Sequence, residues 1–308
     1  MIAREPFSLL LAVYRGDRPD FVRVAFRSAV HDQTRRPDQV IVVRDGPVPA
    51  VLEHCVKQLE ESSPVPVTVV RLEEGSGLGP ALDAGLAASR HDVVARMDAD
   101  DVSMPHRFAV QLPIIESGAD IVGSGLLEFA ADVSDVVGRR TPPCDPAEIA
   151  RYARFHDPFN HPTVVYRRST VLAAGGYRHL PLMEDYWLFA RMLANGARGV
   201  NVPEPLVFYR IGAGAYARRG GTRLLRSEFR LQRSFREEGF TTSGQFLRNV
   251  LVRGGYRLLP EWCRRRAYRR LIATYGERRE PVDIGSGPVS VPEPMSRRKV
   301  PASPPADP

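Results

Sequence analysis

Short apolar segments alternate with segments of helical periodicity through the first hundred residues, and this alternation constrains the fold more than any other feature. Residues 7–13 (FSLLLAV) and 39–46 (QVIVVRDG) are aliphatic and β-branched and end in turn residues, which is typical of buried strands. Apolar residues between them recur at helical spacing. Because strand, helix and strand follow one another closely, the sequence predicts a parallel α/β sheet.

The same pattern continues along the chain. It predicts helices over 49–61, 79–90 and 184–196, strands over 65–73 and 119–130, and a strand with an acidic turn over 92–101. The catalytic unit is expected to end near 201–211. We therefore expect a Rossmann-like, mostly parallel sheet, and a ligand at the carboxyl ends of its strands.

The net charge of +7 is distributed unevenly and indicates three regions. Residues 1–209 contain 22 Lys and Arg against 27 Asp and Glu, whereas residues 210–279 contain 18 against 5. We expect a catalytic domain over 1–210, an Arg-rich helical extension over 211–276, and a disordered Pro- and Ser-rich tail over 277–308.

The chain lacks the sequence motifs of several function classes. The chain has no GxxxxGK[ST] loop, no GxGxxG after its first strand, no GxSxG and no HExxH, and we interpret GSGLG at 75–79 as a turn. The cysteines, Cys55, Cys144 and Cys263, are far apart, which favours a reducing cytoplasm over a disulfide framework. No apolar run reaches the length of a membrane span, and we interpret the N-terminal segment as a strand rather than a leader.

Three carboxylates follow the strand at 92–97 within four positions: Asp98, Asp100 and Asp101. Like charges this close repel one another unless water or a cation neutralises them. One interpretation is a solvated acidic turn that caps a helix beginning near Pro105. The other is a site for a divalent cation, because hard carboxylate oxygens suit Mg²⁺ or Mn²⁺.

An ordered set of motifs favours the second interpretation. SLLLAVYRGD, VVRDGP, MDADDVSMPHRF, FNHPTVVYRRS, GGY and MEDYWLFARMLANG occur in the order found in inverting glycosyltransferases of family 2. The fuller phrases RMDADD, DPFNHPT and EDYWLFARML, with VPEPLVFYR and RRGG, resemble the amylovoran-type transferases of bacterial exopolysaccharide and lipopolysaccharide synthesis. The resemblance spans roughly residues 6–275.

This resemblance implies a GT-A fold, a nucleotide-sugar donor with UDP or dTDP, and Mg²⁺ or Mn²⁺. By the match to family motifs, Asp45 meets the nucleotide base, although its neighbour is Arg44 where the family usually has a second acid. Val13 and Asp98 also belong to the donor site, and Asp98, Asp100 and Asp101 are the metal ligands.

The resemblance also implies the acceptor side of the reaction. Glu184 and Asp185 match the family's acidic pair, with Asp185 as the general base opposite the departing nucleotide. His161 is expected at the diphosphate or the acceptor, or else is a structural group. Three arginines in YRIGAGAYARRGG are expected either in a loop that closes over phosphates or in a solvated basic loop: Arg210, Arg218 and Arg219.

Two other functions remain open at this point. DADDV at 98–102 satisfies the DxDx[TV] pattern of haloacid-dehalogenase-like phosphohydrolases, although that motif belongs on a first strand. The Arg-rich segment could instead bind nucleic acid, although it lacks an aromatic stacking surface, and we expect no nucleic-acid partner.

The Arg-rich segment has two further interpretations. Its amphipathic helices could lie on an anionic membrane surface, which agrees with a glycan or polyprenyl-diphosphate-linked acceptor and with a cytoplasmic, peripheral location. The alternative is that they pack their apolar faces on the catalytic domain, and both can hold together, with one face packed and an Arg-rich rim on lipid. The donor sugar, the acceptor and the linkage are not specified by the sequence.

Overall fold

The computed structural model describes residues 4–211, 222–258 and 263. The N-terminal half alternates strands and helices as the sequence predicts: β1 (Phe7–Tyr14), α1 (Pro19–Val30), β2 (Gln39–Asp45), α2 (Ala50–Ser62), β3 (Val67–Arg71), α3 (Leu78–Ala87), β4 (Val93–Met97), β5 (Val102–Ser103) and α4 (Arg107–Glu116). The remainder comprises β6 (Ile121–Phe129), β7 (Val136–Arg140), α5 (Pro146–Tyr152), the 3₁₀ turn η1 (His161–Thr163), β8 (Val165–Arg167), α6 (Arg168–Ala173), α7 (Glu184–Ala194), β9 (Gly199–Arg210), α9 (Thr222–Glu237), α10 (Ser243–Asn249), the π-helical turn η2 (Val250–Gly254) and α11 (Gly255–Leu258).

The described strands form one sheet in the order β3-β2-β1-β4-β8-β6-β9-β5, with β7 paired to β6. The strands β1 to β4 are parallel, and so are β6 and β9. Shorter antiparallel pairings join β8 to β4 and β6, β7 to β6, and β5 to β9. The predicted α/β fold with a mostly parallel sheet is confirmed, whereas β5, β7 and β9 were not predicted as strands.

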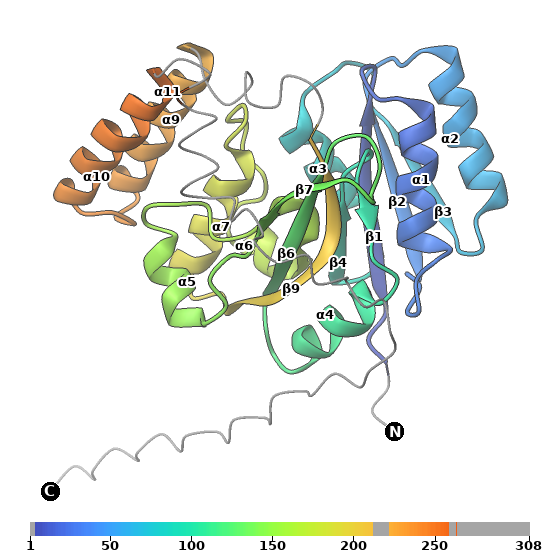
Figure 1. Ribbon diagram of the computed structural model, residues 1–308, viewed down its shortest axis with the longest axis horizontal. Helices are drawn as coiled ribbons and strands as arrows, with labels where there is room; N and C mark the ends of the chain where they lie inside the picture. Colours follow the sequence, from blue (N-terminus) through green and yellow to red (C-terminus); the bar gives the residue numbers. More distant parts are fainter. Residues whose placement is uncertain (1–3, 212–221, 259–262, 264–308) are drawn as a thin grey trace, which may run out of the picture.

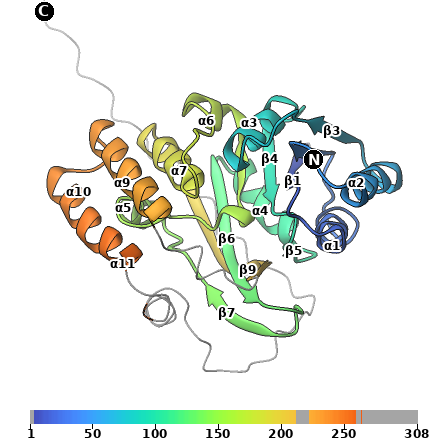
Figure 2. The same cartoon turned by 90° about the horizontal axis from the view of Figure 1, so that it is seen from above.

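Helices cover both faces of the sheet (Figures 1 and 2). On one face α1, α2 and α4 pack side chains such as Phe26, Leu52 and Phe108 against the strands. On the other face α3, α6 and α7 contribute side chains such as Leu82 and Phe189. Burial of these apolar side chains stabilises the sheet from both sides, which is why its central strands are almost uniformly apolar.

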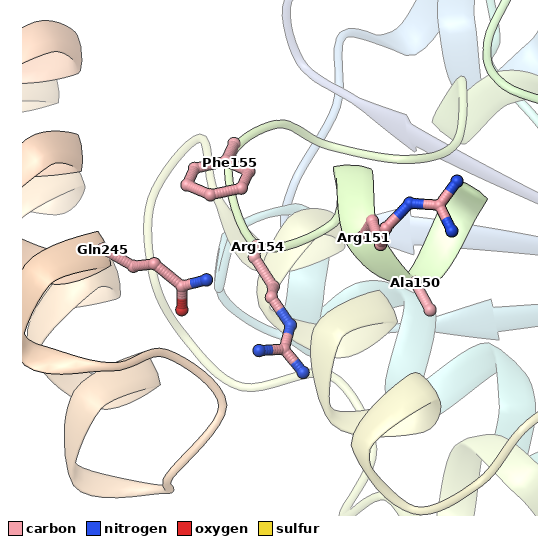
Figure 3. Close-up of a pocket in the computed structure, with 5 residues that line it drawn as sticks. All are labelled: Ala150, Arg151, Arg154, Phe155 and Gln245. Atoms are coloured by element: carbon pink, nitrogen blue, oxygen red, sulfur yellow. The ribbon is translucent and has the colours of Figure 1, made fainter. Parts of the chain in front are cut away.

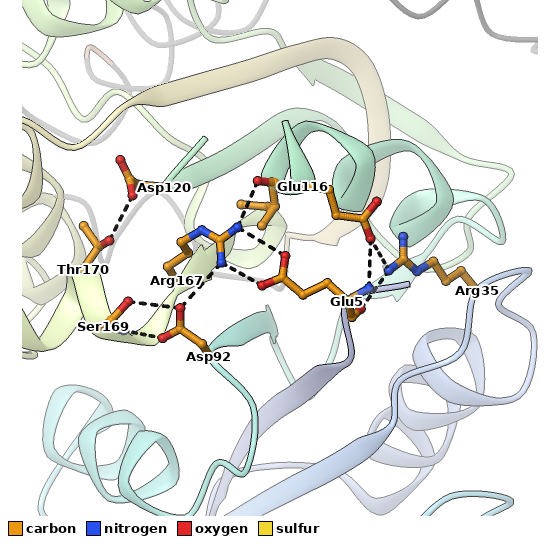
Figure 4. Close-up of polar contacts among 9 residues, drawn as sticks. Glu5, Arg35, Asp92, Glu116, Asp120, Arg167, Ser169 and Thr170 are labelled. Atoms are coloured by element: carbon orange, nitrogen blue, oxygen red, sulfur yellow. Dashed lines mark hydrogen bonds and ion pairs between the residues drawn. The ribbon is translucent and has the colours of Figure 1, made fainter. Parts of the chain in front are cut away.

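The amino end of the sheet is closed by ion pairs (Figure 4). Arg167 of β8 lies 2.8 Å from Glu5 and 3.6 Å from Asp92, and Arg35 lies 2.7 Å from Glu116. These contacts join segments far apart in the sequence at the edge opposite the carboxyl ends of β1, β2 and β4. The polar side chains at this end thus serve structure, and the carboxyl edge is where a ligand is expected.

The C-terminal helices lie beside α7, away from α1 and α2 (Figures 1 and 2). One face of α9 is apolar, and it shares a hydrophobic cluster with α7 and the loop before it: Leu180, Met183, Tyr186, Ala190, Leu224, Leu231 and Phe235. The structure thus shows helices over 222–258, and one face of α9 packs on α7, while the Arg-rich extension expected over 211–276 stays a prediction as a unit. The predicted boundaries at 210 and 276 stay predictions, and the 277–308 tail lies outside the described residues.

Candidate active site

The carboxyl ends of the parallel strands bring the predicted acids to one edge of the sheet. Tyr14, the last residue of β1, pairs with Asp45 of β2, and Leu11 pairs with Met97 of β4. The turns that follow these strands therefore emerge side by side. The antiparallel strand β8 begins at the same edge, so the turn η1 before it lies there too.

The three acids after β4 have different surroundings. The side chain of Asp98 is 28% exposed, and its Oδ1 lies 2.5 Å from Nη2 of Arg96. Asp101 is fully buried, and its Oδ1 accepts a hydrogen bond from the backbone N–H of Arg210 at 2.8 Å. Asp101 Oδ2 is buried without a hydrogen-bond partner among the described residues. The turn is thus built into the protein rather than free in solvent.

Arg210 braces this turn from the end of β9. Its Nε donates to the backbone oxygen of Asp100 at 2.9 Å. Its guanidinium lies over two rings, 3.9 Å from the centroid of Phe21 and 4.4 Å from that of Phe129. The structure therefore shows Arg210 fixing the acidic turn, while its predicted contact with donor phosphates stays a prediction.

A fourth acid, Asp17, joins this group and was missed from the sequence. Burial raises the pKa of Asp17 to about 7, and the nearby Asp100 and Asp98 add to the rise. Burial likewise raises the pKa of Asp100 to about 6, together with repulsion from Asp98. Asp17 follows β1 directly in the motif YRGD, so its position after a strand end was the available indication.

The acidic turn suits a divalent cation. Its donors are hard carboxylate oxygens, one of which, Asp101 Oδ2, lacks a partner among the described residues, and mutual repulsion disfavours their ionised forms. Among the residues that the structure describes, no group of three His, Cys, Asp or Glu side chains is arranged to hold a metal ion. A cation of the Mg²⁺ type takes only one or two carboxylates and completes its shell with substrate phosphates and water, so the role of these acids as metal ligands stays a prediction.

Asp45 holds the loop that starts α3. Its Oδ1 accepts from the backbone N–H of Ser76 at 2.7 Å, and its Oδ2 accepts from that of Gly77 at 2.9 Å. Gly46 has φ +76°, and a Cβ there would lie 2.5 Å from the backbone nitrogen of Gly75, so only glycine fits this turn. The predicted contact of Asp45 with a base stays a prediction. Val13 is buried in the core of β1.

Glu184 and Asp185 form the first turn of α7 at the same edge. Asp185 Oδ1 accepts from the N–H of Tyr186 at 2.7 Å, and the Asp185 side chain is 25% exposed. Burial raises the pKa of Asp185, and burial together with Asp185 raises the pKa of Glu184 to about 7. A half-buried carboxylate with a raised pKa has the properties of a general base.

His161 supports Asp185 from within the protein. Its Nδ1 lies 3.6 Å from Asp185 Oδ2, and its Nε2 lies 2.9 Å from the hydroxyl of Tyr177. Burial and the charge of Arg96 hold the pKa of His161 well below its usual range, so the ring is neutral. Both ring nitrogens thus face protein groups, and the predicted contact of His161 with substrate stays a prediction.

Arg96 places one buried positive charge between the two sets of acids. Its side chain is 2% exposed, and apart from the contact with Asp98 its Nε and Nη1 have no hydrogen-bond partner among the described residues. The same charge opposes the rise in the pKa of Asp185 and of Glu184. The acidic turn after β4 and the expected base, Asp185, therefore lie near the same positive charge, the guanidinium of Arg96.

Sequence reasoning missed Arg96, Tyr177 and Asp157. Burial and repulsion from Asp185 raise the pKa of Asp157 well above its usual range, so this acid belongs to the same neighbourhood. Arg96 interrupts an apolar strand, which was a usable indication, and the other two lie within the quoted motifs GGY and DPFNHPT. The predicted Arg218 and Arg219 lie outside the described residues.

The fold and its carboxyl edge define the class of protein: this is the GT-A fold of nucleotide-sugar transferases. The sequence model of "Glycosyl transferase family 2" matches residues 8–175, more than half of the chain. The chain belongs to this family and is a glycosyltransferase. Neither the phosphohydrolase nor the nucleic-acid alternative is supported, and the acidic motif follows the fourth strand rather than the first.

Similar proteins agree with the family. An amylovoran biosynthesis glycosyltransferase of Erwinia amylovora is 34% identical over 257 residues, which are 82% of this chain and 94% of that protein. A UDP-Gal:alpha-D-GlcNAc-diphosphoundecaprenol beta-1,3-galactosyltransferase of Escherichia coli is 33% identical over 272 residues, 87% of this chain and 97% of that protein. The mannosyltransferase of Pyrobaculum calidifontis, solved with GDP-Man and Mn²⁺, has a TM-score of 0.59 at 15% identity, covering 84% of this chain and 72% of that one.

Proposed function

We propose that this glycosyltransferase moves a sugar, with inversion, from a UDP- or dTDP-sugar to a hydroxyl of a lipid-linked glycan in cell-surface polysaccharide synthesis. The observation that carries the proposal is the presence, at one sheet edge, of an acidic turn and a separate half-buried carboxylate, Asp185. The first suits the leaving nucleotide and the second the attacking hydroxyl. The UDP-dependent, lipid-linked chemistry in the name of the Escherichia coli relative supports this choice.

On the donor side, Asp98 and Asp100, with Asp101 as a further candidate, would hold Mg²⁺ or Mn²⁺. When bound, the cation supplies charge neutralisation for the leaving diphosphate. Arg96 and Arg210 keep the turn in place, the first through Asp98 and the second through the Asp100 carbonyl and Asp101. The Mn²⁺ in the structure of the Pyrobaculum calidifontis mannosyltransferase supports a divalent cation here.

On the acceptor side, Asp185 accepts the proton of the attacking hydroxyl. A base on this side and a nucleotide leaving on the other give in-line displacement, and hence inversion at the anomeric carbon. His161 and Tyr177 keep the Asp185 carboxylate oriented through the contacts at 3.6 and 2.9 Å. Glu184, whose Oε2 accepts from the N–H of Met183, closes the first turn of α7.

Donor binding tests the proposal directly. A screen of UDP-, dTDP- and GDP-sugars with Mn²⁺ should raise the melting temperature with one of the first two. Because a ligand that binds only the folded state stabilises it by mass action, about 2.7 kcal/mol at 100 times Kd, the shift is measurable. EDTA should abolish it. No shift with any nucleotide sugar, or an equal shift in EDTA, would contradict the donor and metal assignment.

The C-terminal helices present an outer face that suits a membrane surface. Four large apolar side chains on α9, α10 and η2 are 49 to 65% exposed: Phe229, Leu247, Leu251 and Val252. The helix α9 also carries exposed arginines: Arg223, Arg226, Arg230 and Arg233. Among residues 4–211, 222–258 and 263, no helix is both long and apolar enough to cross a bilayer. We therefore propose peripheral contact with the anionic inner face of the cell membrane from the cytoplasm.

Vesicle sedimentation checks this contact. Binding should require anionic lipid and weaken steeply with salt, since screening shortens to about 8 Å near physiological ionic strength. Leu247→Gln with Leu251→Gln should reduce binding, whereas Leu172→Gln on α6, where the side chain is 53% exposed, should not. Equal recovery in the supernatant with neutral and anionic vesicles at low salt would leave packing as the only role of these helices.

A further inference from the structure

An open pocket lies between α5 and α10, apart from the edge described above. Its volume is about 290 Å³, and it is lined by Ala150, Arg151, Arg154, Phe155 and Gln245. Figure 3 shows Gln245 extending from α10 toward Arg154, with Arg151 and Ala150 beyond it on α5. The volume is at the lower limit for small-molecule sites, so it suits a compact group rather than a whole nucleotide sugar.

The pocket carries positive charge that no acid among the described residues neutralises. Its lining contains two guanidinium groups and no carboxylate, and neither Arg151 nor Arg154 forms an ion pair with a described residue. Arg248 adds a third guanidinium, 4.5 Å from the ring centroid of Phe155. Burial, together with the charges of Arg253 and Arg248, lowers the pKa of the adjacent His156 to about 4. Such a pocket favours an anion.

A second pocket also contains two arginines, but these arginines have side-chain partners. It lies on α1 and α2, with a volume of about 430 Å³, and is lined by Arg23, Phe26, Arg27, His31, Asp32 and Leu59. There Arg27 lies 3.4 Å from Asp32, and Arg23 donates to Gln58 at 3.3 Å. Its guanidinium groups therefore already have side-chain partners, whereas Arg151 and Arg154 have no ion pair with any residue that the structure describes.

The wall of the first pocket is fixed and adjoins the acceptor side. The backbone oxygen of Arg154 accepts from Asn249 at 2.8 Å, and that of Phe155 accepts from Arg253 at 2.9 Å. The hydroxyl of Tyr186, the residue after Asp185, donates to the backbone oxygen of Ala153 at 2.8 Å. Ala153, the residue before Arg154, thus contacts α7, the helix that carries the expected base Asp185.

We propose that this pocket binds the diphosphate of an isoprenyl-diphosphate-linked acceptor, an inference that rests on the proposed function. Arg151 and Arg154 can each form two parallel N–H···O bonds with phosphate oxygens, and Gln245 donates a further hydrogen bond. Exposed apolar side chains of the neighbouring turns, Leu251 and Val252, provide a surface for the isoprenoid chain. The acceptor sugar then extends along the Ala153 segment toward Asp185.

Binding of farnesyl diphosphate in EDTA tests the proposal, because without a metal the donor site does not retain a diphosphate. The double variant Arg151→Gln, Arg154→Gln should weaken farnesyl diphosphate binding roughly tenfold or more. Arg23→Gln with Arg27→Gln, in the second pocket, is the matched control and should bind like the wild type. Farnesol, which lacks the diphosphate, should bind wild type and variant equally weakly.

Turnover separates this inference from the proposed function. With a diphosphate-linked acceptor, the Arg151/Arg154 double variant should raise the acceptor KM and leave the UDP-sugar melting shift unchanged. Unaltered farnesyl diphosphate binding in that variant, with a normal UDP-sugar shift, would overturn the pocket assignment alone. Loss of binding to phosphatidylglycerol vesicles with unaltered farnesyl diphosphate binding would also overturn it, because the arginines would then contact bilayer headgroups. Absence of a melting shift with both UDP- and dTDP-sugars in the wild type would instead contradict the proposed function.

Discussion

Asp185→Asn should lower kcat by roughly 10²- to 10⁴-fold while the variant still binds nucleotide sugar and metal. An amide of the same shape keeps the packing of the α7 N-terminus but cannot take the proton of the acceptor hydroxyl. The measurement is turnover with saturating donor beside the donor-induced melting shift. A large loss of turnover with an intact shift is the expected result.

Glu184→Gln is the matched control for this variant, since the two acids are adjacent in the same helical turn. If Glu184→Gln lost turnover and Asp185→Asn kept it, the base would be Glu184. The pH profile adds a second check. Burial raises the pKa of Asp185 above its ordinary value of 3.8, and a base acts only when deprotonated. Turnover should therefore fall as pH decreases through that raised pKa.

Tyr177→Phe should change this pH profile more than it changes the fold. The variant loses only a hydroxyl, whose contact at 2.9 Å orients His161 beside Asp185. We expect a moderate loss in kcat with donor KM unchanged, measured over a pH series. If the variant were less stable at every pH but its folded form had the kcat of the wild type, Tyr177 would contribute only to packing.

The sheet and the positions of the acids could be predicted from the sequence, because both depend on local patterns. Residues 7–13 and 39–46 are rich in aliphatic and β-branched residues and end in turn residues, so they predict buried strands whatever surrounds them. Once the strands are parallel, the acids after β2 and β4 must share an edge. Asp17 could have been placed by the same argument, because it follows the strand that lies between those two.

The partners of these acids could not be predicted, because they depend on packing between distant segments. The contact of Arg210 with Asp101 joins residues 109 positions apart, and that of His161 with Tyr177 depends on how the loop before α7 folds back. Similarly, the Arg-rich segment predicted amphipathic helices, but its sequence alone did not show which part of the protein each apolar face would contact. The structure turns Leu231 and Phe235 onto the α7 cluster and leaves Phe229 exposed.

Asp100→Asn should abolish transfer and yet leave the metal-free protein at least as stable as the wild type. Burial and Asp98 raise the pKa of Asp100 to about 6, so above that pH the folded state holds a carboxylate that it disfavours relative to the unfolded chain. An amide removes this repulsion, and it also removes a ligand of the cation that neutralises the leaving diphosphate. Stability and function should therefore move in opposite directions, with a gain in stability that begins as pH rises above the ordinary pKa of 3.8 and is complete above about pH 6.

Melting in EDTA at pH 7.5 and at pH 5, beside turnover with Mn²⁺, separates the two effects. Asp135→Asn is the control, because Asp135 is an exposed acid in the turn before β7 and should alter neither quantity. Normal turnover of Asp100→Asn in EDTA would show that no cation acts at this turn. A destabilised variant at both pH values would show that Asp100 holds the turn together, and the acids would then be structural. A stable but inactive variant is the expected combination. It would show that the carboxylates of Asp17, Asp98 and Asp100, which repel one another in the metal-free protein, are grouped there to bind a ligand.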